Sequence, residues 1–226
     1  MVLKKRFCKE AILWKHVSCP YILTFQGVFY HNDVPAIVTP WMDKGNITEY
    51  LLRFPDANRL RLLLCVIKGV KYLHSCNIAH GDIKGPNVLI ADTTPPRAIL
   101  ADLGFTRVST ISAKASSAED GTVSFMAPEL LAPPKFGLDK GVPSKEADIY
   151  ALGMTVYQVL TGKWPFFPKK ELEIILPIIS GVRPIKPENA EAIGMTEDIW
   201  NLLQETWRED RTKRPDISKI LGTSAG

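Results

Sequence analysis

The sequence of 226 residues has few cysteines, and their spacing fits no metal site. The four cysteines show no paired ligand spacing, and no cluster of histidines accompanies them. We therefore expect free, buried thiols in a reducing compartment rather than disulfides or structural zinc. The cysteines are Cys8, Cys19, Cys65 and Cys76.

Long apolar runs are also absent. The longest, at 62–67 and 174–179, fall far short of the about 20 residues that a membrane-spanning helix needs. Lys4-Lys5-Arg6 comes before any apolar run develops, so we expect no secretory signal peptide. The sequence thus predicts a soluble protein of the cytoplasm that has no membrane partner.

Charge of neither sign dominates. The 28 Lys and Arg residues face 24 Asp and Glu residues, spread evenly, for a net charge of +4. This balance predicts a mixed, solvated surface and no nucleic-acid partner. The length and the apolar fraction of 46% fit one domain of ordinary size with a proper core.

The periodicity of the first 40 residues indicates one helix and one hairpin. Apolar residues separated by charged ones predict a helix over 5–18, stopped by Pro20. Segments 22–30 and 35–39 are rich in β-branched and aromatic residues. Because turn-forming residues lie between them, these two segments are expected to pair as a β-hairpin.

The rest of the chain predicts mostly helices. Asn46 and Glu49 fit a capping box that opens a helix. Segment 58–75 carries apolar residues at helical spacing, which predicts a buried helix whose stripe is Leu60, Leu63, Leu64, Ile67, Val70 and Leu73. We further expect a surface loop at 133–143. Short strands are expected at 88–90 and 98–101, and helices at 144–160, 169–180 and 196–205.

The stretch from Ala79 to Leu89 is the most informative part of the chain. It places an acid, a base and an amide on one loop directly before an apolar strand. Asp102-Leu103-Gly104 and then Met126-Ala127-Pro128-Glu129 follow in that order. Each motif alone is weak. Their joint order and spacing resemble the catalytic loop, the magnesium-binding motif and the activation-segment end of a protein kinase.

The resemblance covers about residues 5–220 and is closest to the tyrosine kinase-like group of Ser/Thr kinases. It implies an α+β, protein kinase-like fold. Residues 1–42 would form a truncated small lobe, one helix plus a β-hairpin, together with the hinge. Residues 43–226 would form the mainly helical large lobe, so that the whole chain is one protein kinase domain.

The same resemblance implies ATP-dependent phosphoryl transfer to Ser and Thr hydroxyls of protein substrates. Asp82 would accept or orient the substrate hydroxyl, and Lys84 would reach the transferring phosphate. Asn87 and Asp102 would hold Mg²⁺, which prefers hard oxygen ligands. Thr122 would bridge Asp82 and Lys84, and with Lys84 it favours the Ser/Thr class.

Other family positions are implied for nucleotide binding and for support. Thr39 would be the gatekeeper, Met42 would offer backbone hydrogen bonds to adenine, and Leu89 belongs to the same nucleotide site. Glu129 would pair with Arg214. Glu10 would be the helix glutamate, and Asp148 would anchor the catalytic loop. An apolar stack would be formed by Trp14, Phe25, His80 and Leu103.

The chain departs from the family pattern at its start and at Gly81. Gly81 replaces an arginine that receives an activation-segment phosphate in many kinases, so we expect no such switch here. No glycine-rich loop is visible, and Lys4 and Lys5 lie too close to Glu10 to act as the strand lysine.

Two explanations follow: a fragment of an active kinase, or a pseudokinase that acts as a binding or scaffolding module. The first is favoured because a scaffold has no chemical need for all of Asp82, Lys84, Asn87 and Asp102. The sequence leaves the oligomeric state open.

Overall fold

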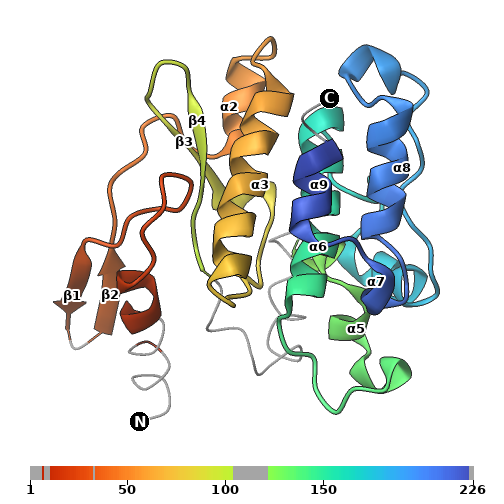
Figure 1. Cartoon of the computed structure of the whole chain (residues 1–226), viewed down its shortest axis with the longest axis horizontal. Helices are drawn as coiled ribbons and strands as arrows, with labels where there is room; N and C mark the ends of the chain where they lie inside the picture. The colour runs from red at the N-terminus through yellow and green to blue at the C-terminus, as the bar shows by residue number, and fades with distance from the viewer. Residues whose placement is uncertain (1–6, 8–10, 33, 104–121, 224–226) are drawn as a thin grey trace.

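The computed structural model describes residue 7 and residues 11–32, 34–103 and 122–223. Within these residues, a small N-terminal part with a two-stranded sheet lies beside a larger, mainly helical body (Figure 1). A second two-stranded sheet lies in the larger part, next to its first long helix. No helix among the described residues is both long and apolar enough to cross a bilayer.

The N-terminal helix covers residues 11–15 of the described chain, so it ends earlier than the expected residue 18. The side chain of His16 explains this early end. Its Nδ1 lies 2.7 Å from the carbonyl oxygen of Ile12, the acceptor that a continuing helix would use. The backbone N–H of His16 donates instead to Leu13, which tightens the last turn. Pro20 does not end the helix.

The expected hairpin is confirmed. Strand β1 (Gly27–His31) pairs in antiparallel register with β2 (Val34–Val38), with Phe29 opposite Ala36. β1 begins five residues later than expected because Ile22 and Leu23 pair with the larger part of the chain. The N–H of Leu23 donates to the carbonyl of Leu100 at 2.7 Å.

Two capped helices follow. Helix α2 (Ile47–Arg53) opens with the expected capping box of Asn46 and Glu49. Helix α3 (Arg59–Ser75) is capped by the side chain of Asn58. The predicted stripe of α3 is wrong at Leu60, which is 49% exposed and lines a cavity. The buried face of α3 is instead made by Leu62, Leu63, Val66, Ile67, Gly69, Val70, Leu73 and His74.

The second sheet confirms the two short strands. β3 (Val88–Ala91) pairs antiparallel with β4 (Arg97–Leu100), so that Val88 lies opposite Leu100. Helix α3 packs against β4. Val88 and Leu100 are completely buried. The loop before β3 and the residues after β4 therefore emerge from a rigid base at the same end of the hairpin.

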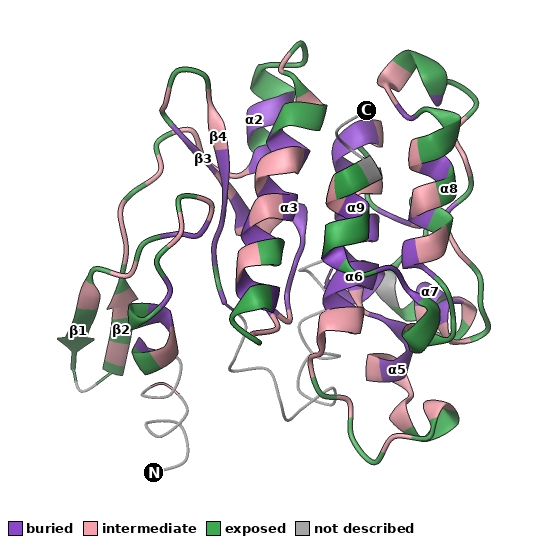
Figure 2. Ribbon diagram, viewed as in Figure 1, coloured by how far each residue is buried: buried purple, intermediate pink, exposed green. Residues whose placement is uncertain are grey.

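Helix α6 (Lys145–Thr161) begins at the predicted Ser144 cap and ends at Gly162 in a left-handed conformation. Almost every turn of α6 is buried, and α3 and α8 pack against it (Figure 2). The predicted helices near 169–180 and 196–205 are confirmed as α7 (Glu171–Ile179) and α8 (Glu197–Thr206).

Short elements were missing from the sequence interpretation. Helices α5 (Pro128–Leu131) and α9 (Ile217–Thr223) were not predicted, because four and seven residues give too little periodicity. The expected surface loop at 133–143 contains a 3₁₀ turn. Among the described residues, the 3₁₀ turns are Gly85–Asn87, Thr122–Phe125, Pro133–Phe136, Glu191–Ile193 and Arg211–Lys213.

Candidate functional site

The segment between α3 and β3, which we call the 79–87 loop, carries most of the predicted site residues. The side chains of His80, Asp82 and Lys84 are almost fully buried, although they are polar. Buried polar groups require partners, because their desolvation is otherwise uncompensated. The hydrogen bonds of the loop therefore define its geometry.

The carboxylate of Asp148 on α6 anchors the 79–87 loop. It accepts hydrogen bonds from the backbone N–H groups of His80 at 2.7 Å and Gly81 at 2.8 Å. Its Oδ2 also lies 2.9 Å from Nε2 of His74 at the end of α3. Gly81 has a φ of +78°, a conformation that costs glycine little. The Asp148 carboxylate thus fixes the backbone at the start of the 79–87 loop.

His80 connects this loop to the end of β4. Its Nδ1 accepts from the N–H of Asp82 at 3.2 Å, so Nε2 carries the proton and donates to the carbonyl of Ala101 at 3.1 Å. Complete burial lowers the pKa of His80 below its usual value, because the charged ring would lose its hydration. The ring is therefore neutral at physiological pH. It fixes the residue immediately before Asp102.

Asp82, Lys84 and Thr122 form one polar cluster. The Lys84 Nζ donates to Oγ1 of Thr122 at 2.7 Å and lies 3.5 Å from Oδ2 of Asp82. Thr122 belongs to the turn that precedes α5 and is 38 residues away in sequence from Lys84. The lysine therefore lies between the carboxylate and the threonine. That Thr122 itself bridges Asp82 and Lys84 stays a prediction.

Asn87 and Asp102 lie on two segments that are hydrogen-bonded to each other at one end of the β3–β4 hairpin. The amide of Asn87 donates to the carbonyl oxygen of Asp82 at 2.8 Å and to its Oδ2 at 2.7 Å. The N–H of Ala101 donates to the carbonyl of Asn87 at 2.8 Å, which holds the two loops together. Asp102 has a φ of +56°, a conformation that aspartate tolerates better than most residues.

These two side chains fit a magnesium ion. Because the Asn87 amide nitrogen is turned to Asp82, its carbonyl oxygen is directed away from that carboxylate. It can act with the Asp102 carboxylate as a pair of hard oxygen ligands. No set of three or more His, Cys, Asp or Glu side chains in the described part of the chain could hold a metal. Mg²⁺ needs no such set, since it retains several waters.

The residues assigned to the nucleotide line one open cavity of about 750 Å³. Thr39 and Met42, which follow β2, form one side of it, and Leu89 of β3 forms another. Pro86 also lines the cavity, so the hollow reaches the residue adjacent to Asn87. The lining combines apolar side chains with the charged residues Asp43, Glu49 and Arg53. Such a cavity suits a molecule with an apolar ring and a charged end.

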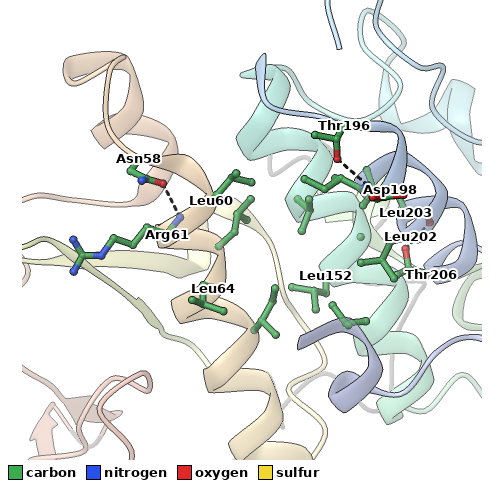
Figure 3. A pocket seen from close by; sticks show the side chains of 16 residues that line it. Asn58, Leu60, Arg61, Leu64, Leu152, Thr196, Asp198, Leu202, Leu203 and Thr206 are labelled. Atoms are coloured by element: carbon green, nitrogen blue, oxygen red, sulfur yellow. Dashed lines mark hydrogen bonds between the residues drawn. The ribbon is translucent and has the colours of Figure 1, made fainter. Parts of the chain in front are cut away.

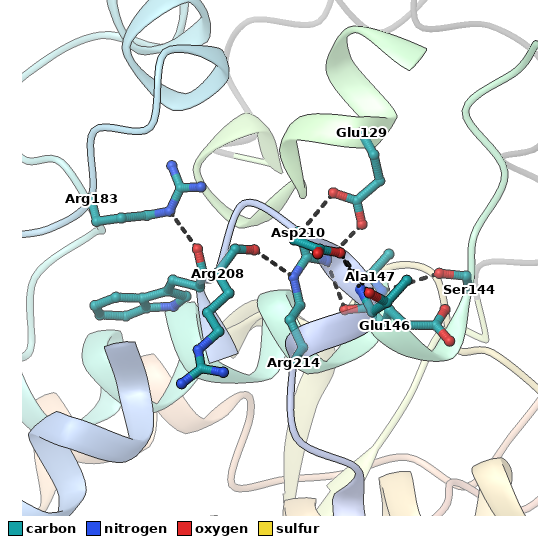
Figure 4. Close-up of polar contacts among 10 residues, drawn as sticks. Glu129, Ser144, Glu146, Ala147, Arg183, Arg208, Asp210 and Arg214 are labelled. Carbon is teal, nitrogen blue, oxygen red and sulfur yellow. Dashed lines mark hydrogen bonds and ion pairs between the residues drawn. The ribbon is translucent and has the colours of Figure 1, made fainter. Parts of the chain in front are cut away.

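Glu129 and Arg214 form the predicted pair, and both are buried (Figure 4). Nη1 and Nη2 of Arg214 donate to the two carboxylate oxygens of Glu129 at 2.6 and 2.8 Å. The same guanidinium donates to the carbonyls of Glu146 and Arg208, both at 3.0 Å. This pair connects α5 to the start of α6 and to the segment before α9.

Tyr150 of α6 lies beside that pair. Its ring is 5.2 Å from the guanidinium of Arg214 and 5.3 Å from that of Arg183. The hydroxyl has no hydrogen-bond partner within the described residues, and burial raises its pKa to about 12. Tyr150 therefore stays neutral and supports the Glu129–Arg214 pair by packing.

Some predicted positions cannot be placed together. Glu10, Lys4 and Lys5 lie outside the described residues. Trp14, His80 and Leu103 are buried and Phe25 is half-buried, but a continuous stack of the four stays a prediction.

Sequence reasoning missed two supporting residues. His74 holds Asp148, and Gln158 of α6 accepts the N–H of Gly85 at 3.1 Å. The sequence pattern could have indicated Gln158, since it is a polar residue within an apolar helix. The structure shows that its side chain is buried. No sequence pattern indicated His74, because its partner Asp148 lies 74 residues away.

Comparison with known proteins gives a consistent result. The family model described as "Protein kinase domain" matches residues 2–224. The chain is 29% identical over 226 residues to Serine/threonine-protein kinase STY46 of Arabidopsis thaliana. It is 26% identical over 225 residues to Serine/threonine/tyrosine-protein kinase HT1 of the same plant. It is 27% identical over 215 residues to Serine/threonine-protein kinase SAPK3 of Oryza sativa subsp. indica.

These alignments cover nearly all of this chain but only part of each relative. They include 97% of the chain with STY46 and HT1 and 94% with SAPK3. The chain spans 36% of STY46, 54% of HT1 and 62% of SAPK3.

Proposed function

We propose, because this chain belongs to the protein kinase family, that it transfers the γ-phosphoryl group of ATP to Ser and Thr hydroxyls of protein substrates. The observation that carries the proposal is the polar cluster of Asp82, Lys84, Asn87 and Thr122, held by direct contacts. Such a cluster is expensive to bury and serves no purpose in a simple packing core.

In the proposed reaction, the substrate hydroxyl oxygen attacks the γ-phosphorus while the bond from that phosphorus to the β–γ bridging oxygen breaks and ADP leaves. Asp82 orients the hydroxyl and receives its proton. The Asn87 amide and the Lys84 ammonium fix the direction of the Asp82 carboxylate. Asp82 is therefore positioned before the substrate arrives, which reduces the entropic part of the barrier.

Lys84 supplies positive charge next to the transferring group. Because the Lys84 side chain is buried, less water screens its charge, and its electrostatic interaction with the phosphate is stronger. Thr122 holds the Lys84 ammonium at 2.7 Å and connects the 79–87 loop to the turn before α5. We assign the preference for Ser and Thr over Tyr to this Lys84–Thr122 contact, as the family resemblance implies.

Asn87 and Asp102 are the proposed ligands of Mg²⁺. When bound, the ion supplies neutralisation of the phosphate charge that develops during transfer. The chain's contribution is to hold both side chains at one end of the β3–β4 hairpin, through the bond between Ala101 and Asn87. Thr39, Met42 and Leu89 are the proposed contacts of the adenine ring, since they line the same cavity.

We further propose a division into a small lobe with its hinge at 1–42 and a large lobe at 43–226, and a location in the cytoplasm. The location is supported by Cys19, Cys65 and Cys76, which form no disulfide with one another. Neither proposal involves a nucleic acid or membrane partner.

The test is transfer of labelled γ-phosphate from Mg-ATP to a mixed pool of Ser, Thr and Tyr peptides, followed by phosphoamino acid analysis. We expect label on phosphoserine and phosphothreonine. Lys84→Ala should lower the rate at least about a hundredfold, the cost of removing one charge-stabilising donor. Lys71→Ala, an exposed lysine of α3, is the matched control and should leave the rate unchanged. Absence of label would favour a binding module, and label on tyrosine alone would refute the Ser/Thr assignment.

A further inference from the structure

Gln158 is a polar side chain within the largely apolar helix α6, and it is only 3% exposed. Its Oε1 accepts the backbone N–H of Gly85 at 3.1 Å, across 73 residues of sequence. Gln158 does not line the cavity between α3, α6 and α8 that Figure 3 shows. The burial of an amide at this position is thus matched by its bond to the 79–87 loop.

Gly85 opens the 3₁₀ turn that carries Asn87, the proposed magnesium ligand. Gly85 is itself buried, and both of its backbone polar groups form hydrogen bonds. Its N–H donates to Gln158, and its carbonyl oxygen accepts the N–H of Val88. Because Asn87 lies between the two residues of that second bond, the position of Gly85 fixes the backbone of Asn87.

The Gly85 backbone is in close contact with two helices, α2 and α6. A Cβ added at Gly85 would lie 2.5 Å from Oε1 of Gln158 and 2.7 Å from Cγ2 of Thr48 on α2. Atoms at such distances overlap, so no side chain fits here unless the turn or its neighbours shift. The turn is thus held from two sides, by a hydrogen bond to α6 and by packing against α2.

We propose that Gln158 is a positioning residue that directs the side-chain oxygen of Asn87 toward Mg²⁺ by holding Gly85, an inference that rests on the proposed function. The Asn87 amide nitrogen donates to Asp82, which sets the rotation of the amide group. Gly85 sets the place of the backbone from which that side chain extends. A residue that orients a metal ligand without touching the metal commonly changes metal affinity by roughly 10–100-fold when it is replaced.

Gln158→Met tests the proposal, because methionine has a similar length and offers Gly85 no carbonyl oxygen. The Mg²⁺ concentration that half-saturates phosphoryl transfer should rise by at least about tenfold. Gln158→Glu keeps an oxygen acceptor and should restore most of the wild-type value. The KM for the peptide substrate should stay unchanged in both variants. A merely structural role would lower the amount of folded enzyme and the rate at every Mg²⁺ concentration, without a shift in half-saturation.

Thr155 provides the matched control, since it is completely buried on the same helix and its hydroxyl donates to Ala151 within α6. Thr155→Val removes this bond at nearly constant volume and should leave the half-saturating Mg²⁺ concentration unchanged. Circular dichroism verifies that each variant is folded. Equal half-saturation in the wild type and folded Gln158→Met would overturn the proposal, as would an equal rise in Thr155→Val.

NMR of the metal-free chain separates this inference from the proposed function. In Gln158→Met, the Gly85 N–H should exchange with solvent at least about tenfold faster, since it loses its hydrogen bond. The resonances of the Asn87 side-chain amide should shift as well. Both changes are expected whether or not the chain transfers phosphate. A wild type without transfer activity would refute the proposed function, whereas unchanged Gly85 exchange and Asn87 resonances in Gln158→Met would overturn the positioning role.

Gly85→Ala is the second variant, used if Gln158→Met does not fold. Its added methyl group must displace either the Gln158 oxygen or the turn itself. The Asn87 side-chain resonances should therefore shift, and the half-saturating Mg²⁺ concentration should rise as expected for Gln158→Met. A folded Gly85→Ala chain with wild-type Asn87 resonances and wild-type Mg²⁺ dependence would contradict the positioning role.

Discussion

Asp148 fixes the backbone of the 79–87 loop through the N–H groups of two consecutive residues, His80 and Gly81. Two short, charge-assisted hydrogen bonds to one buried carboxylate leave the loop little freedom. The next residue is Asp82, so its position follows directly from that of Asp148. At the residue scale, the loop residue Asp82 is positioned by a side chain of helix α6.

His80 makes the stability of the chain depend on pH. Its folded pKa lies below its ordinary value of 6.5 because the ring is buried. As the pH falls below about 6.5, the unfolded chain therefore takes up a proton that the native state does not. The free energy of unfolding should fall by up to about 1.4 kcal/mol per pH unit on this account, until the folded pKa is reached.

The measurement is urea unfolding at pH 7.5 and 5.5 for the wild type and for His80→Phe, which cannot titrate. The loss of stability on acidification should be smaller in His80→Phe than in the wild type. His31→Phe is the matched control, since His31 is exposed and should leave the pH dependence as in the wild type. Equal losses in wild type and His80→Phe would show that the ring protonates freely in the folded state.

At the scale of helices, a buried ion pair holds separate elements together. The Glu129–Arg214 ion pair joins α5, which follows the Thr122 turn, to the segment before α9. The position of Thr122, and with it the contact to Lys84, depends on the placement of α5. This buried pair therefore supports the candidate site from a distance, through the elements that it connects.

Removing one partner of this pair should be costly. Arg214→Ala leaves the buried Glu129 carboxylate without its partner, and we expect a loss of about 3–5 kcal/mol in the free energy of unfolding. Lys219→Ala breaks the more exposed pair with Glu205 and should cost less than about 1 kcal/mol. Urea midpoints measure both. The double variant Glu129→Leu, Arg214→Met should recover much of the loss.

If Arg214→Ala shifted the urea midpoint no more than Lys219→Ala does, the pair would have no structural role. An Arg214→Ala chain without any cooperative transition would agree with the expected loss, since whole domains are stable by only about 5–15 kcal/mol.

Local signals made the helices and strands of the whole molecule predictable. The caps at Asn46 and Ser144 and the periodicity of α3, α7 and α8 lie within short windows of sequence, and the structure confirms them. The order of motifs was enough to indicate the family, which the match over residues 2–224 shows.

Long-range pairing was not predictable. Leu23 pairs with Leu100, His74 with Asp148, and Gly85 with Gln158, and no local pattern names such partners. The same limit explains Leu60, whose spacing fits the buried stripe of α3 although it lines an open cavity. Burial depends on which helices lie opposite, and that information is not contained in one helix.

At the scale of the whole molecule, we propose that the 79–87 loop and the end of β4 together hold a magnesium–nucleotide complex. Thermal unfolding with and without Mg-ATP, beside Asp102→Asn, tests it most directly. A ligand at a hundred times its Kd stabilises the native state by about 2.7 kcal/mol. We predict a rise in Tm with Mg-ATP that is absent with ATP and EDTA and absent in Asp102→Asn. No rise in the wild type, or an equal rise without magnesium or without Asp102, would show that these residues do not hold a magnesium–nucleotide complex.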